Sequence, residues 1–135
     1  MFIRLSSLFI LIPLIELAVL IRVGQEIGLM STLIIVIITG ITGAYLAQTE
    51  GIITFRKIQN ELHAGKIPAD SLLDGVLILV GGLLLLTPGF ITDIAGFLIL
   101  IPFTRSSLKN YLRERFKKKF DSEQVHTSYT IKDDI

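Results

Sequence analysis

Residues Val76–Ile101 read VLILVGGLLLLTPGFITDIAGFLILI, and this stretch decides the fold. It is 26 residues long, its one charged residue is Asp93, and the sequence TPGFITD interrupts it near the middle. A hydrocarbon core about 30 Å thick is crossed by roughly 20 apolar helical residues. The stretch is therefore either one long tilted span with a kink at Pro88, or two helical arms that fold back on each other.

The local chemistry of the interruption favours the fold-back. The proline of Thr87-Pro88-Gly89 lacks a backbone N–H and disfavours helical backbone in the residue before it, and the glycine tolerates positive φ. Thr92 and Asp93 are good N-caps for a second helix that starts at Ile94. Irregular backbone at membrane depth needs protein or water around its polar groups. We therefore expect the interruption to be packed against other helices or to lie near the far interface.

The composition indicates an integral membrane protein. Hydrophobic residues make up 51% of the 135 residues, and the mean hydropathy is +0.69, which a soluble domain of this length could not bury. The absence of cysteine excludes a disulfide framework, an iron–sulfur site and a thiol nucleophile. We predict an all-α polytopic membrane bundle of two transmembrane helices and a Pro-Gly-broken helical hairpin, with amphipathic cytoplasmic helices.

Two apolar blocks precede the central stretch. Residues 5–21 form a transmembrane helix, retained because no A-x-A-like cleavage site follows it, and residues 29–47 form a second, uncharged one. Glu16 lies deep in the first block, where an ionisable group costs at least a few kcal/mol and normally faces a bundle interior. The short connector 22–28 makes the second helix antiparallel to the first.

The second transmembrane helix carries small residues at helix-packing spacing. Gly40 pairs with Ala44 and Gly43 with Ala47, and small residues at this spacing let helix backbones approach closely. We expect this face to receive the first helix. A hydroxyl of Thr39 or Thr42 then helps to satisfy Glu16, or the threonines bond only their own backbone.

Polar segments flank the central stretch. We predict an amphipathic helix over 49–64 on the membrane surface or over the bundle, hairpin arms over 69–87 and 91–102, a basic amphipathic helix over 104–120 and a disordered tail over 121–135. Asp70 is expected to cap the first arm. His63 stands alone, without a second ligand at metal spacing, and is read as a solvated histidine.

The stretch 105–119 is strongly basic, with seven Lys or Arg residues and one acid, Glu114. A basic amphipathic helix directly after a membrane segment is typical of an anchor on anionic lipid head groups. Its place next to the bilayer argues against the competing reading, a nucleic-acid patch. We expect no nucleic-acid partner.

Charge counting supports the hairpin. With a hairpin, the N-terminus, the polar segment 48–75 and the C-terminal region share one side, with twelve Lys and Arg residues inside and only Arg22 outside. With one kinked span, the best orientation leaves nine inside and four outside. The positive-inside rule prefers the first arrangement, with both termini cytoplasmic.

The segments PLIELAVLIRVG, ITGITGAYLAQTEG, GKIPADSLLDG and GGLLLLTPGFITDIAGFLILIP together resemble the FxsA family of small bacterial cytoplasmic-membrane proteins, and TPGFITD is the most specific part. The resemblance covers about Leu11 to Arg105. The family is named for a member that relieves the exclusion of phage T7 by the F plasmid. The resemblance implies a multi-pass inner-membrane protein that binds or sequesters another membrane-associated protein, and it supplies no catalytic residues.

Three functions are open at this stage. The preferred one is a non-enzymatic interaction or regulatory protein without catalytic, cofactor or metal residues, whose partners are the bilayer and either a membrane protein or a second copy of the chain. The alternative is a small transporter or proton-linked channel subunit that uses Glu16 and Asp93. A lipid enzyme that brings His63 to these carboxylates is a third. The candidate structural or functional residues are Glu16, Gly40, Gly43, Ala44, Pro88, Gly89, Phe90, Thr92 and Asp93.

Overall fold

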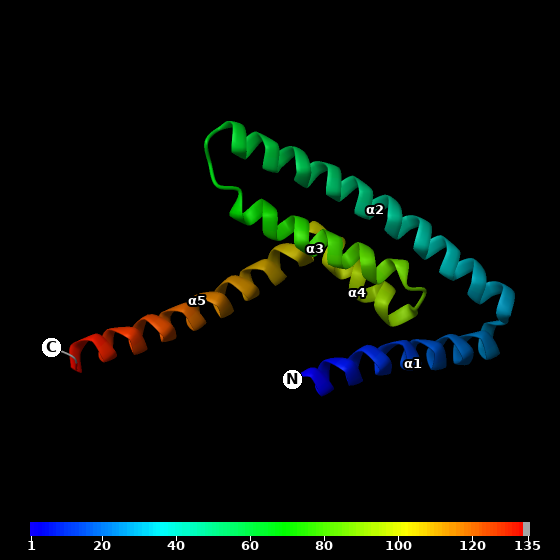
Figure 1. The fold of residues 1–135 in the computed structure, drawn as a ribbon. Helices are drawn as coiled ribbons and strands as arrows, with labels where there is room; N and C mark the ends of the chain where they lie inside the picture. Colours follow the sequence, from blue (N-terminus) through cyan, green and yellow to red (C-terminus); the bar gives the residue numbers. More distant parts are fainter. Residues whose placement is uncertain (134–135) are drawn as a thin grey trace.

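The computed structural model describes residues 1–133 and the side chains of residues 1–119. Across this range the chain forms helices and no strand (Figure 1). The helices are α1 (Phe2–Ile27), α2 (Leu29–His63), α3 (Ala69–Leu86), α4 (Phe90–Leu100) and α5 (Pro102–Asp133). The all-α prediction is confirmed.

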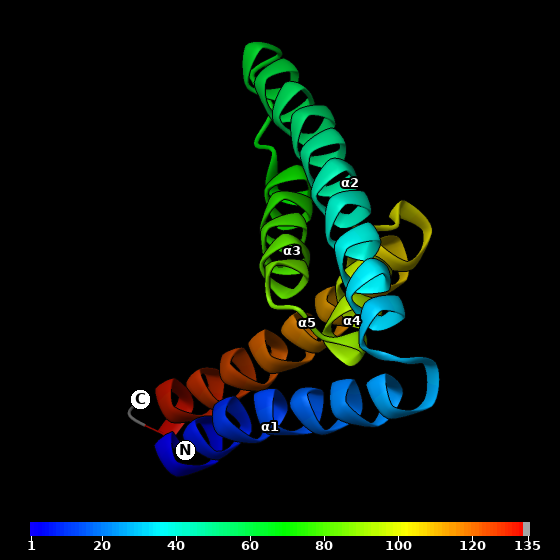
Figure 2. The ribbon, with the colours of Figure 1, turned by 90° about the vertical axis from the view of Figure 1, so that its right-hand side faces the viewer.

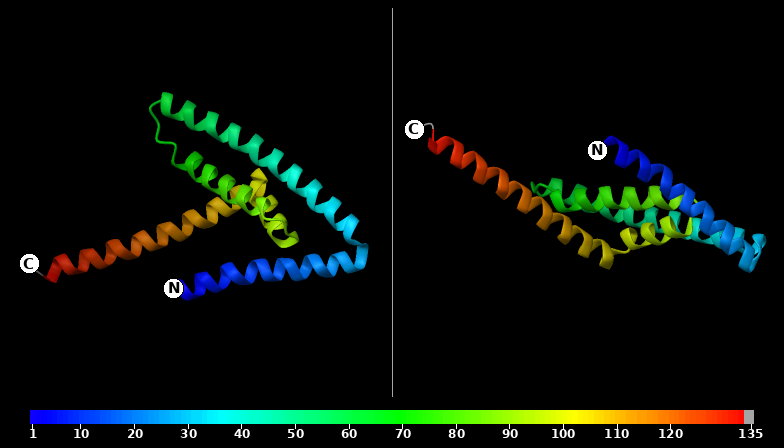
Figure 3. Two further views of the ribbon diagram at one scale, coloured as in Figure 1. Left: turned by 45° about the vertical axis from the view of Figure 1, so that its right-hand side comes forward. Right: turned by 90° about the horizontal axis from the view of Figure 1, so that it is seen from below.

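Helix α3 is the centre of the bundle. It runs antiparallel to α2 and lies beside it along its length, and α4 folds back along α3 (Figures 1 and 2). Helix α1 touches the bundle through α2 and α4, and α5 leaves it toward the C-terminus (Figure 3). The two arms on either side of Thr87-Pro88-Gly89 therefore form a hairpin rather than one kinked helix.

The helix ends follow from glycine and proline. Gly28, with φ 91°, joins α1 to α2, and Gly65, with φ 72°, follows the end of α2; both have the left-handed backbone that glycine adopts most readily. Helix α3 ends at Leu86 because Pro88 keeps Thr87 extended. Helix α5 begins with Pro102, since the first helical position needs no N–H donor.

Several helix bounds differ from the sequence prediction. The segments 29–47 and 49–64 form one continuous helix, α2, because no proline separates them and Gly51 is tolerated inside it. Helix α1 extends beyond 5–21 at both ends. Helix α5 continues through 121–133, a segment without glycine or proline in which a disordered tail was expected; residues 134–135 of that tail lie outside the described residues.

The packed core lies between α2, α3 and α4. Its buried apolar side chains are Ile78, Leu85 and Leu100. Leu85 fills the space next to two glycines: a Cβ added at Gly43 or at Gly96 would come within 2.7 Å of its side chain. Gly81 faces Gly96 where α3 crosses α4, and an added Cβ would lie 3.2 Å or less from the carbonyl oxygen opposite. Glycine thus permits the close approach of the hairpin arms.

The outer surface is that of a membrane protein. Helices α1, α2 and α3 are each long and apolar enough to cross a bilayer, and most of their large apolar side chains are exposed. Helices α4 and α5 are bent by 83° at the break before Pro102. The exposed apolar surface is the expected lipid-facing side of a membrane bundle, because lipid tails replace water around it.

Candidate functional site

Glu16 is the buried carboxylate that joins α1 to the hairpin. Its side chain reaches the N-terminus of α4, where the backbone N–H of Ile91 donates to Oε2 at 3.2 Å and the N–H of Thr92 donates to Oε1. The first N–H groups of a helix have no partner inside it, and the positive end of the helix dipole favours an anion. Glu16 therefore caps α4 from another helix.

Gly89 makes room for this contact. A Cβ added there would collide with the Glu16 carboxylate. The backbone of Gly89 is extended, with φ −174°, which any residue can adopt. The positive φ that the sequence analysis noted as open to Gly89 is not used, and the glycine is needed for space.

Asp93 is the second buried carboxylate of the hairpin. Its Oδ2 accepts a hydrogen bond of 2.8 Å from the Thr39 hydroxyl of α2. Its Oδ1 is buried without a hydrogen-bond partner among the described residues. We call Glu16, Thr39, Gly89, Thr92 and Asp93 the hairpin-tip site.

The geometry decides between the two alternatives for the threonines and corrects the predicted cap of α4. The hydroxyl of Thr39 is 2.8 Å from Asp93 and 3.0 Å from the carbonyl oxygens of its own helix at Ile35 and Val36, and it does not bond Glu16. The hydroxyl of Thr42 donates to the carbonyl of Ile38 in its own helix, which is the alternative that the sequence left open. Helix α4 begins at Phe90, so Thr92 and Asp93 lie in its first turn and do not cap it. A carboxylate is a stronger acceptor for backbone N–H groups than the hydroxyl of Thr92. The sequence could not predict this cap, because it gives no distance between Glu16 and the first turn of α4.

The small residues of α2 face a different partner from the one expected. Gly43 packs against Leu85 of α3, and Ala47 lies beside Gly82 of α3. A Cβ added at Gly40 would meet no atom within 4 Å. This face of α2 therefore receives α3 rather than α1, because α1 diverges from α2 beyond the Gly28 turn.

The hairpin tip lies half-way along the apolar part of α2. Leu29 to Glu50 measures about 32 Å at 1.5 Å per residue, close to the thickness of a hydrocarbon core. Thr39, which bonds Asp93, is about 15 Å from Leu29. The apolar part of α3 from Asp74 to Leu86 is about 18 Å long, so the hairpin covers about half of a membrane.

A second polar site lies at the opposite end of the hairpin. Arg105 of α5 is 7% exposed and donates three hydrogen bonds of 3.0 Å, from Nε to Asp74, from Nη2 to Glu50 and from Nη1 to the carbonyl of Leu100. A guanidinium group presents its donors in a fixed planar fork. Arg105 thus ties α5 to α2, α3 and α4 at one point.

Two further basic residues extend this contact along α5. Lys109 Nζ pairs with Asp74 at 2.9 Å and with Asp70 at 3.2 Å, and Arg113 pairs with Asp70. The three basic residues are spaced by four and so share one helix face. We call Glu50, Asp70, Asp74, Arg105, Lys109 and Arg113 the basal charge cluster.

Sequence reasoning missed the basal charge cluster. It expected Asp70 to cap α3, but the residue before the helix is Pro68 and no side chain caps it. It also placed all the basic residues of 105–119 toward lipid. The available signal was the spacing of four between Arg105, Lys109 and Arg113, together with acids at Glu50 and Asp74 beside apolar segments.

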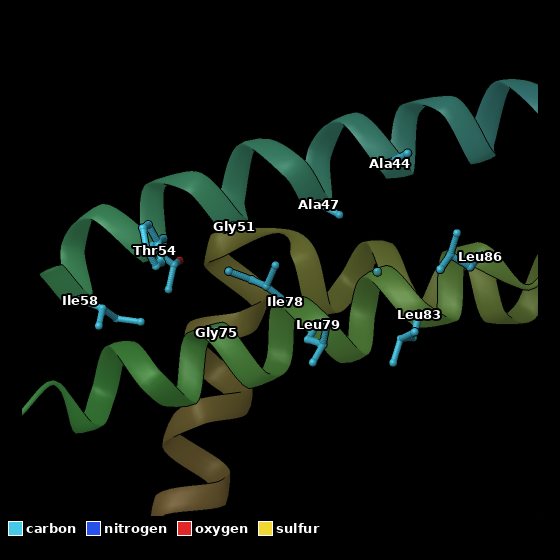
Figure 4. A pocket seen from close by; sticks show the side chains of 12 residues that line it. Ala44, Ala47, Gly51, Thr54, Ile58, Gly75, Ile78, Leu79, Leu83 and Leu86 are labelled. Carbon is cyan, nitrogen blue, oxygen red and sulfur yellow. The ribbon is translucent and has the colours of Figure 1, made fainter.

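An apolar groove of about 490 Å³ runs between α2 and α3 (Figure 4). Small residues of both helices line it, and Thr54 lies near one end. Thr54 is buried, and its hydroxyl lacks the bond to the preceding turn that the other threonines of α2 make. The groove lining is Ala44, Ala47, Gly51, Thr54, Phe55, Ile58, Gly75, Ile78, Leu79, Gly82, Leu83 and Leu86.

His63, which the sequence analysis interprets as a solvated histidine, ends α2 and is exposed. Among the described residues, no three His, Cys, Asp or Glu side chains gather closely enough to hold a metal ion. His63 lies at the far end of α2 from the hairpin-tip site (Figure 1), so the structure does not bring it to Glu16 and Asp93.

Comparisons with known proteins agree on one family. The family model described as FxsA cytoplasmic membrane protein matches residues 7–115. The UPF0716 protein YtzA of Bacillus subtilis is 44% identical over 105 residues, which is 78% of this chain and 83% of that protein. The UPF0716 protein FxsA of Serratia marcescens is 37% identical over 101 residues, which is 75% of this chain and 73% of that protein.

The UPF0716 protein FxsA of Escherichia coli K12 is 39% identical over 88 residues, which is 65% of this chain and 56% of that protein. No solved structure matches. The matched range 7–115 includes both the hairpin-tip site and the basal charge cluster. The chain belongs to the FxsA family of cytoplasmic membrane proteins.

Proposed function

We propose that this protein is a non-enzymatic interaction protein of the bacterial cytoplasmic membrane, whose bundle holds α5 against the cytoplasmic surface as a binding arm. The observation that carries the proposal is the attachment of α5. The helix turns by 83° from α4 directly after the hairpin, and the basal charge cluster holds it at that turn. A helix held at a fixed angle presents its exposed side chains to a binding partner.

The membrane orientation that fits this proposal has both termini in the cytoplasm. The basal charge cluster and the turn at Gly28 are about one hydrocarbon thickness apart along α2. The positive-inside rule assigns the basic α5 to the cytoplasm. The turn at Gly28 then faces outward, and the hairpin tip lies near the middle of the bilayer.

The basic residues of α5 form two groups with different roles. Arg105, Lys109 and Arg113 point into the basal charge cluster. Beyond them, Arg115, Lys117 and Lys119 are exposed. Each cation near an anionic leaflet contributes about 1 kcal/mol, so this second group favours a position on the membrane surface.

The apolar residues of α5 suit a protein partner at that surface. Tyr111 is 54% exposed and Phe116 is 61% exposed, and the guanidinium of Arg115 lies 5.4 Å from the Tyr111 ring centre. Aromatic residues and arginine are enriched at protein interfaces. We propose that this part of α5 contacts another membrane-associated protein.

Site-specific crosslinking in bacterial membranes tests the proposal. A photoreactive residue at Phe116 is expected to yield a defined protein adduct, and the triple variant Arg115→Glu, Lys117→Glu, Lys119→Glu is expected to lose it. The triple variant keeps the basal charge cluster, so the bundle stays folded. Phe9, which is exposed on α1, is the matched control position and should not give that adduct.

Two outcomes would contradict the proposal. One is crosslinking from Phe116 to lipid alone, and the other is the same set of adducts from Phe116 and Phe9. An adduct between two copies of this chain would identify self-association as the interaction.

A second candidate function, proton-linked transport, has one observation in its favour. Glu16 of α1 accepts hydrogen bonds from the first turn of α4, and Asp93 lies in that turn, inside the membrane-length part of the bundle. Intramembrane carboxylates and broken helices recur at transport sites. A proton flux in liposomes that the Glu16→Gln and Asp93→Asn variants abolish would establish this function, and the lack of flux in the unmodified protein would exclude it.

A further inference from the structure

The two carboxylates of the hairpin-tip site are both buried but are not equally satisfied. Glu16 is 5% exposed and accepts two backbone N–H bonds at the α4 N-terminus. Asp93 is 6% exposed and accepts one bond, from Thr39, through Oδ2. Its Oδ1 is enclosed by protein and has no hydrogen-bond partner within the described part of the chain.

Glu16 and Asp93 also differ in the charges that surround them. The N–H groups and the dipole of α4 compensate a negative charge on Glu16. The described ion pairs of this chain lie elsewhere, in the basal charge cluster and between Arg22 and Glu26. Among the described groups that meet the first turn of α4, Thr39 of α2 is neutral and Glu16 of α1 is itself a carboxyl group, so no cation balances a charge on Asp93. Burial without a balancing cation disfavours the charged form of a carboxyl group.

We propose that Asp93 and Glu16 form a proton-binding site inside the membrane, in which the proton resides on Asp93 while backbone N–H groups of α4 hold the Glu16 carboxylate. Asp93 takes the proton because its Oδ1 lacks a hydrogen-bond partner among the described residues, and a buried ionised carboxylate needs partners for both of its oxygens. A neutral Asp93 removes the charge that would oppose burial of the hairpin tip. The inference requires neither a protein partner nor transport.

The proton has a structural consequence. Asp93 links α4 to α2 and Glu16 links α4 to α1, so the described hydrogen bonds that join the tip to these two helices pass through this pair. Loss of the proton would place a negative charge on Asp93 near the Glu16 carboxylate. The packing of the tip against α1 and α2 is therefore coupled to the proton occupancy of Asp93.

Infrared spectroscopy of the full-length protein in lipid nanodiscs tests the inference. A protonated carboxylic acid has a C=O stretch distinct from that of a carboxylate. We expect such a band near neutral pH, shifted by isotope-labelled aspartate and not by isotope-labelled glutamate. This comparison uses the unmodified chain and therefore does not depend on whether a variant folds.

Two variants assign the band to the proposed geometry. Asp93→Asn should abolish it, and Thr39→Val should shift its frequency, because the carboxyl group of Asp93 then loses its hydrogen bond with the Thr39 hydroxyl. A purely structural role for Thr39 would not move the band. The inference is overturned if no protonated band exists, if labelled glutamate shifts it, or if replacing Na⁺ by K⁺ changes it, which would indicate a bound cation.

Discussion

Replacing Arg105 by glutamine is expected to destabilise the bundle strongly. The variant loses the bonds to Glu50 and Asp74 at 3.0 Å and leaves the Glu50 carboxylate, whose side chain is 11% exposed, without its cation. Asp74 keeps Lys109 at 2.9 Å, so most of the effect comes from Glu50. Removing one partner of a buried pair costs about 3–5 kcal/mol, and we expect a loss in that range.

The assay is reversible denaturant unfolding in detergent micelles, with the free energy of unfolding compared among variants. Arg22→Gln is the matched control, since Arg22 pairs with Glu26 at 3.6 Å on the surface, where both side chains are more than half exposed. Such a pair contributes less than about 1 kcal/mol. The two arginine variants should therefore differ by at least about 2 kcal/mol.

A double variant separates the lost bonds from the unpaired charge. Adding Glu50→Gln to Arg105→Gln removes the unpaired carboxylate and is expected to recover part of the stability. If Arg105→Gln is no more destabilising than Arg22→Gln, or if the double variant is less stable than the single one, the basal charge cluster does not hold α5 as described.

Two further predictions concern glycines, with Gly40→Ala as the common control because an added Cβ there meets no atom within 4 Å. Gly96→Ala places a Cβ 2.9 Å from the carbonyl oxygen of Gly81 and should destabilise the hairpin by about 1–3 kcal/mol in the same unfolding assay; stability equal to that of the control would contradict the close crossing of α3 and α4. Gly89→Ala should displace the Glu16 carboxylate from α4, which is measured as faster amide hydrogen exchange at Ile91. Unchanged exchange at that amide would argue against the cap.

The sequence predicts the hairpin through two signals. Pro88 stops α3, and the count of basic residues, with only Arg22 outside, favours the return of the chain. The arm 69–87 differs from α3 by one residue at its end. The proline signal depends on a few residues and the charge count on the sequence alone, so neither depends on how the helices pack.

The partners of the polar residues were not predictable in the same way. An acid in an apolar span indicates that it points inward, as Glu16 does, but not which helix it meets. Likewise, the small residues around Gly43 predict a close helix contact but do not show which helix makes it. The sequence assigned Arg105 to lipid because it belongs to a run of basic residues. Its acidic partners, Glu50 and Asp74, lie on other helices, and the sequence does not show that they meet Arg105.

Cysteine accessibility tests the central claim, that the hairpin returns the chain to the side from which it entered. The chain has no cysteine, so single substitutions at exposed positions, Gln25 beside the Gly28 turn and Asn110 on α5, can be labelled alone. In intact cells, a membrane-impermeant maleimide is expected to label Gln25→Cys, and to label Asn110→Cys only after the membrane is opened. Labelling of Asn110→Cys from outside in intact cells would contradict the account.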